Sequence, residues 1–115
     1  MTDSDLSNSI KAIILGLCYA NQTEPVRIEF ANVAHTYFDD ETIADKIAYS
    51  FDWLEREGFV RCLNKRKSSC VQAEITSKGI RLLRQNDTGE RLASAVKEGA
   101  ISLAAKLIIT LFETM

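Results

Sequence analysis

The first apolar repeat of the chain has the three-to-four-residue spacing of a helix with one buried face. Its members are Leu6, Ile10, Ile13, Ile14 and Leu17. Residues 21–25 end in a proline, which disfavours helical geometry in the residue before it. We therefore expect a first helix over about residues 5–21 and a short second helix over about residues 30–37.

The clearest helical pattern spans about residues 40–57. Its apolar stripe consists of Ile43, Ile47, Phe51 and Leu54. Asp39 or Asp40 can cap the free N–H groups at its start, and carboxylates there suit the positive end of the helix dipole. Gly58 is well placed to end this helix in the left-handed conformation.

Two β-type runs follow, over residues 59–63 and 70–75, and a polar basic stretch separates them. This pattern predicts a hairpin. Thr76 can cap a helix over residues 77–85, and Asp87 with Glu90 predicts a capping box at the start of a last helix over about 89–113. The expected fold is mainly α with a small β-hairpin: a domain over residues 1–86 and a C-terminal helix within residues 87–115.

The chain has 115 residues, of which 46% are hydrophobic and 26% charged, so it suits one globular domain with one core. Its acidic first residues precede no signal-type apolar segment. Its three cysteines are an odd number at irregular spacing, which does not suit a secreted disulfide framework. We expect a cytoplasmic protein.

The formal net charge of −2 conceals an uneven distribution along the chain. Residues 1–57 carry eleven acidic and four basic side chains, whereas residues 58–84 carry one acidic and seven basic side chains. Local potential steers a partner more than mean charge does. An anionic ligand is therefore expected on residues 58–84.

Two phrases resemble the winged-helix (winged helix-turn-helix) domain: Trp53–Val60, with the sequence WLEREGFV, and Ile75–Leu83, with the sequence ITSKGIRLL. The first is similar to the end of a recognition helix, and the second to the return strand of a wing entering the next helix. The likeness covers about residues 6–85. With the last helix included, the layout is similar to small winged-helix proteins of unknown function from phages and prophages. The resemblance implies a fold that serves both DNA binding and protein docking.

The leading functional hypothesis is a non-enzymatic DNA-binding regulator that contacts DNA mainly through its basic wing. Basic side chains on a hairpin can neutralise phosphates without reading bases. The candidate residues are Arg61, Lys65, Arg66, Lys67, Lys78 and Arg81. The same residues also fit a solvated hairpin tip without a ligand.

The competing hypothesis is a protein-interaction module, an inhibitor or adaptor, whose acidic long helix docks on a basic protein surface. That helix carries seven acids at or near its ends and surface against two bases, so duplex phosphates would repel it. The candidate docking residues are Asp39, Asp40, Glu41 and Asp45.

The last predicted helix is apolar on most of its surface, and from residue 99 to 112 its only charge is Lys106. Fourteen residues are about six too few to span a bilayer, so no membrane partner is expected. The pattern favours a homodimer interface formed by Leu92, Val96, Gly99, Leu103, Leu107 and Leu111. The alternative is that this helix packs on the first helix of its own domain.

The sequence predicts no catalytic residue, cofactor or metal. The single histidine, His35, has no nucleophile placed around it and suits a turn or helix end. Cys18 is expected in the core. Cys62 and Cys70 flank Arg66 symmetrically, so a simple hairpin would place them opposite each other, as two thiols or as a redox-sensitive pair.

Overall fold

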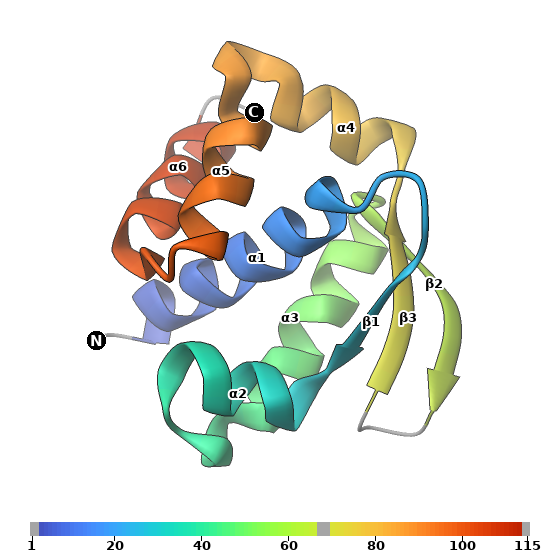
Figure 1. Ribbon diagram of the computed structural model, residues 1–115, viewed down its shortest axis with the longest axis vertical. Helices are drawn as coiled ribbons and strands as arrows, with labels where there is room; N and C mark the ends of the chain where they lie inside the picture. Colours follow the sequence, from blue (N-terminus) through green and yellow to red (C-terminus); the bar gives the residue numbers. More distant parts are fainter. Residues whose placement is uncertain (1–2, 67–69, 114–115) are drawn as a thin grey trace.

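The computed structural model describes residues 3–66 and 70–113, and the side chains of residues 4–64 and 71–113. The elements in chain order are α1 (Asp3–Ala20), β1 (Val26–Glu29), α2 (Phe30–Phe38), η1 (Glu41–Ile43), α3 (Ala44–Arg56), β2 (Val60–Arg66), β3 (Cys70–Ile75), α4 (Ser77–Arg84), η2 (Gln85–Asp87), α5 (Thr88–Lys97) and α6 (Ile101–Glu113). One small antiparallel sheet lies at the edge of the molecule, with the helices packed to one side of it (Figure 1). The expected mainly α fold with a small β component is confirmed.

The sheet has three strands in the order β1-β3-β2, where the sequence pattern predicted only the hairpin of β2 and β3. The added strand, β1, pairs antiparallel with β3 and places Val26 opposite Ala73 and Ile28 opposite Val71. These residues turn towards the helices, and Ile28 is buried. β1 has only four residues, so its alternating pattern was too short to be distinguished from the preceding loop.

The hairpin turns later in the chain than expected, because Cys70 pairs with Arg66 and the strand pairing is therefore not symmetric about Arg66. Cys62 lies opposite Ala73 and Arg66 lies opposite Cys70, with the irregularity between Cys62 and Asn64. The extra residue Leu63 has the character of a β-bulge. The expectation that Cys62 and Cys70 face each other across the strands is therefore wrong.

The α3 region begins and ends with local signals that the sequence contained. Asp40 caps the single turn η1, because its carboxylate accepts a hydrogen bond of 3.0 Å from the backbone N–H of Thr42. Asp39 instead ends α2, in the left-handed conformation at φ 51°. Gly58 follows α3 at φ 82°, a conformation that glycine adopts without strain, as the sequence predicted.

The C-terminal segment forms two helices instead of the one long helix predicted. Gly99 adopts φ 73° between α5 and α6, and this left-handed residue separates the two helices. The predicted capping box at Asp87 and Glu90 is also wrong. Asp87 itself is left-handed, at φ 56°, and its side chain makes no capping hydrogen bond.

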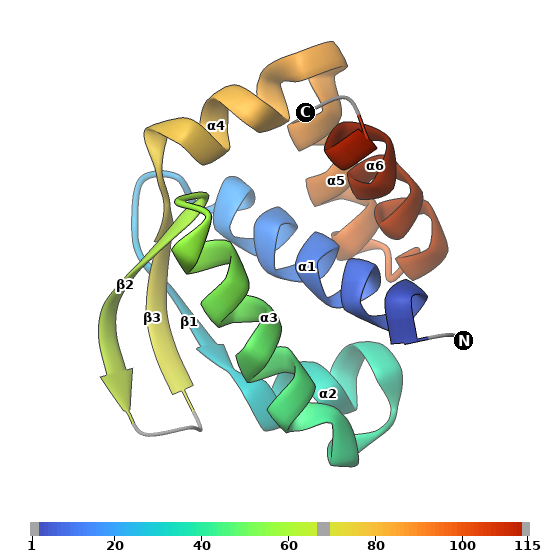
Figure 2. The same cartoon turned by 180° about the vertical axis from the view of Figure 1, so that it is seen from behind.

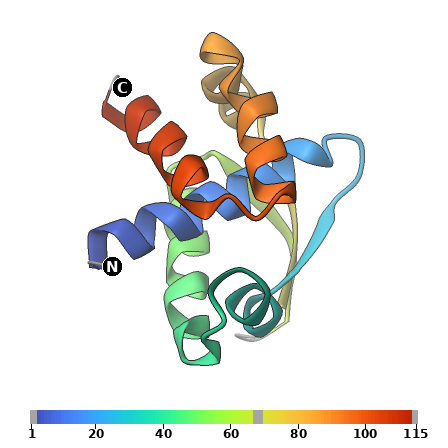
Figure 3. The ribbon, with the colours of Figure 1, turned by 60° about the vertical axis from the view of Figure 1, so that its left-hand side comes forward.

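α1 is the centre of the core, with α5 and α6 on one side and α3 and the sheet on the other (Figures 1 and 3). Because neighbours cover it from two sides, residues outside its predicted stripe are buried as well, among them Ala12 and Leu15. Cys18 is fully buried, as expected. Burial raises the pKa of its thiol to about 12.

The packing on α1 uses most of the residues that the sequence assigned to a dimer interface. Buried within the single chain are Leu92, Val96, Leu107 and Leu111. Gly99 lies in the turn between helices, and Leu103 is 48% exposed. The six residues therefore do not form one continuous exposed surface. The alternative agrees with the structure, because α5 and α6 pack on α1 of the same chain.

An aromatic cluster joins the end of α6 to the end of α3 and the start of β2. The Phe112 ring centroid lies 5.6 Å from that of Trp53 and 6.2 Å from that of Phe59. The Lys11 ammonium stands 4.0 Å from the centre of the Trp53 ring. Burial lowers the pKa of Lys11, against the opposing effect of the Glu57 carboxylate. The C-terminal helices thus also brace the helix that precedes the hairpin.

Candidate functional site

The outer face of α3 consists of Asp45, Tyr49, Asp52 and Arg56, spaced four, three and four residues apart along one side of the helix. The opposite side, with Ile47, Phe51 and Leu54, is buried. Tyr49 is 66% exposed, the highest exposure among the large hydrophobic side chains that the structure describes. The Arg56 guanidinium lies 5.8 Å from the Tyr49 ring centre, within the range of a cation–π contact.

The four acids predicted for protein docking are all exposed, but they differ in their surroundings. Asp39 closes α2, and Asp40 accepts hydrogen bonds from the side chain and backbone of Thr42, which lower the pKa of its carboxyl group. Glu41 lies 3.6 Å from the imidazole Nδ1 of His35, which is in the last turn of α2, as expected for a helix-end residue. Asp45, in the first turn of α3, stands on the outer face itself.

Two of the basic residues predicted for DNA binding interact within the chain. Arg61 forms an ion pair of 3.1 Å with Glu74 on the neighbouring strand β3. Lys78 donates a hydrogen bond of 2.7 Å to the backbone carbonyl of Glu57, and its ammonium lies 5.0 Å from the centre of the Phe59 ring. Arg81 is exposed on α4.

The predicted basic surface is also divided in space. α4, with Lys78 and Arg81, lies at the end of the sheet where β2 begins, whereas the Arg66 end of β2 lies at the opposite end of the sheet (Figure 2). At about 3.3 Å per residue, the six steps from Val60 to Arg66 span about 20 Å. Lys65 and Arg66 have described backbone only, and Lys67 lies outside the described residues. Among the described residues, Lys78 and Arg81 on α4 therefore do not share one patch with the Arg66 end of β2.

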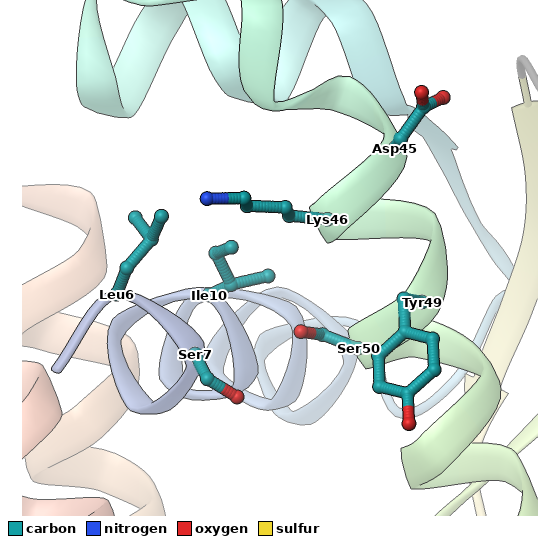
Figure 4. A pocket seen from close by; sticks show the side chains of 7 residues that line it. All are labelled: Leu6, Ser7, Ile10, Asp45, Lys46, Tyr49 and Ser50. Carbon is teal, nitrogen blue, oxygen red and sulfur yellow. The ribbon is translucent and has the colours of Figure 1, made fainter. Parts of the chain in front are cut away.

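A groove that the sequence did not predict lies between the first half of α1 and α3 (Figure 4). Its volume is about 330 Å³, and it is lined by Leu6, Ser7, Ile10, Asp45, Lys46, Tyr49 and Ser50. Ile10 and Ser50 are almost fully buried and form its floor. Because it meets the outer face of α3 at Asp45 and Tyr49, the two features form one continuous surface.

The described residues contain no group of three or more histidine, cysteine, aspartate or glutamate side chains that could hold a metal ion. Within the same part of the chain, no helix is both long and apolar enough to cross a membrane.

Comparison of the chain with family models, with curated proteins and with solved structures found no match. The candidate site therefore rests on its own geometry and charge.

Proposed function

We propose that this chain is a winged-helix protein. Two features support the assignment: the order α1-β1-α2-α3-β2-β3, in which the long helix α3 leads directly into the hairpin, and the pairing of the short strand β1 with β3. The phrases WLEREGFV and ITSKGIRLL occupy the end of α3 and the passage from β3 into α4. These two positions agree with what the resemblance to winged-helix domains implies, which supports the proposal.

We further propose that the chain is a non-enzymatic docking module that binds a cationic protein surface through the outer face of α3. The observation that carries this proposal is the exposed Tyr49 on an acidic helix face, with Asp45 and Asp52 in the flanking turns. Aromatic side chains such as tyrosine are typical anchors of protein interfaces. Phosphates of duplex DNA would instead meet like charge at the N-terminal turn of this helix.

DNA contact through the wing is the second candidate function. It is favoured by the basic residues Lys65 and Arg66 at the end of β2. This mode predicts DNA binding that depends steeply on salt and weakens when Lys65, Arg66 and Lys67 are replaced by alanine. Binding that is unchanged in this triple variant would exclude the wing as the contact.

A labelled helical peptide of lysine and alanine, titrated with the full chain at low salt, tests the docking proposal by fluorescence anisotropy. Asp45→Lys is expected to weaken binding about tenfold. The substitution removes one attraction of about 0.7 kcal/mol and adds one repulsion of about the same size, which together correspond to a factor of about ten in the dissociation constant. Glu90→Lys is the matched control: both acids lie in the first turn of their helices, so both variants lose the same helix-dipole interaction. Equal weakening by both variants would contradict a site on α3.

A further inference from the structure

The groove between α1 and α3 has the form of a socket for one apolar side chain. Leu6 and Ile10 contribute its α1 wall, one helical turn apart, while Tyr49 and Ser50 contribute the α3 side. Ile10 is 1% exposed and Ser50 is 2% exposed, so the floor is closed by the core. A volume of about 330 Å³ gives ample room for an aliphatic or aromatic side chain.

The charges around the groove indicate which kind of segment would bring that side chain. Asp5 is exposed in the first turn of α1, and Asp45 is exposed in the first turn of α3. The Asp45 side chain points away from the groove (Figure 4). Cationic groups on either side of an apolar anchor would therefore meet carboxylates.

Lys46 is the one basic residue among those that line the groove. Its side chain extends from α3 towards α1, above Ile10 (Figure 4). Its charge also makes a minor contribution to the lowered pKa of Asp40, after the hydrogen bonds from Thr42. An anionic ligand would need Lys46 as its partner, whereas a cationic segment would bind better without this charge.

We infer that the groove between α1 and α3 receives an apolar anchor side chain from a cationic protein segment that lies along the outer face of α3. The inference rests on the proposed docking function and adds the chemistry of the partner. Burial of the anchor in the groove would add to the affinity, while the flanking charges would orient the segment and accelerate its encounter.

The test uses two helical lysine–alanine peptides that differ only in a central leucine or alanine, titrated into the ¹⁵N-labelled full chain. The leucine peptide is expected to bind about tenfold more tightly and to shift the amide signals of Leu6 and Ile10. Lys46→Gln should tighten both peptides about threefold, which a purely structural lysine would not do. Leu6→Asn should remove the preference for leucine, and its unfolding curve checks that the fold is retained.

The outcomes separate this inference from the proposed function. Equal affinity of the two peptides, or shifts at Tyr49 and Asp52 without shifts at Leu6 and Ile10, would overturn the anchor groove while leaving docking on α3 intact. Absence of binding by either peptide, or tighter binding of a peptide with glutamate in place of lysine, would overturn both.

Discussion

Replacement of Leu92 by alanine tests whether the C-terminal helices belong to the core of the single chain. Leu92 is fully buried, and its Cγ lies 3.4 Å from the position that a Cβ on Gly16 of α1 would occupy. Removal of a leucine side chain from such a site costs about 3 kcal/mol, through lost burial and the cavity left behind. For a domain of this size, that loss corresponds to a fall in melting temperature of about 12 °C.

Leu103 provides the matched control, because it is the same residue type in the same segment but is 48% exposed. Leu103→Ala is expected to change the free energy of unfolding by less than about 0.5 kcal/mol. Urea unfolding followed by circular dichroism, at two protein concentrations tenfold apart, measures both variants. Similar losses in the two variants, or a loss for Leu92→Ala that disappears on dilution, would refute packing within one chain and point to an interface between copies.

Three further substitutions or reactions test individual contacts. Gly79→Ala should destabilise the fold by about 2 kcal/mol in urea unfolding, because the new Cβ would collide with the backbone carbonyl of Phe59, the residue before β2. The exposed Ser77→Ala is the control, and a neutral Gly79→Ala would contradict this close approach. Thr76→Ala should lower the free energy of unfolding by about 1 kcal/mol, because the Thr76 hydroxyl accepts a 3.1 Å hydrogen bond from the N–H of Gly79 and caps α4. Thr76→Ser should keep most of this stability, and equal losses in both variants would exclude the cap. Burial raises the pKa of Cys18 to about 12, so its thiol should resist iodoacetamide at pH 8 in the folded chain and react with it in urea. Mass spectrometry measures the alkylation, and rapid alkylation of Cys18 without urea would contradict its burial.

The elements with strong local signals could be predicted from the sequence. α3 and α4 have regular apolar spacing and recognisable ends, so their positions agree with expectation within a few residues. β1 was missed because four residues contain little periodicity, and the bulge at Leu63 was missed because register depends on pairing between strands. The break at Gly99 was missed because apolar residues continue on both sides of it and preserve the helical spacing.

The candidate site was only partly visible in the sequence for a similar reason. Of the four predicted docking acids, only Asp45 lies in α3, and its exposure follows from the apolar stripe on the other side of the helix. Asp39, Asp40 and Glu41 precede α3, because Asp39 is the C-cap of α2 and the turn η1 begins after Asp40. The groove could not be predicted, since it pairs Leu6 and Ile10 with Tyr49 and Ser50, about 40 residues further along the chain. The sequence assigns Arg61 and Lys78 to DNA binding because neither the ion pair of Arg61 with Glu74 nor the hydrogen bond from Lys78 to the Glu57 carbonyl can be inferred from local spacing.

The central claim is that the outer face of α3 binds a cationic protein surface and that this chain does not use it to bind DNA. The most direct measurement compares a generic duplex and the lysine–alanine peptide, both fluorescently labelled, by anisotropy with the full chain at low salt. We predict saturable, salt-sensitive binding of the peptide that Asp45→Lys weakens, and no binding of the duplex. Binding of the duplex that Asp45→Lys leaves unchanged, together with no binding of the peptide, would contradict this claim and favour the wing.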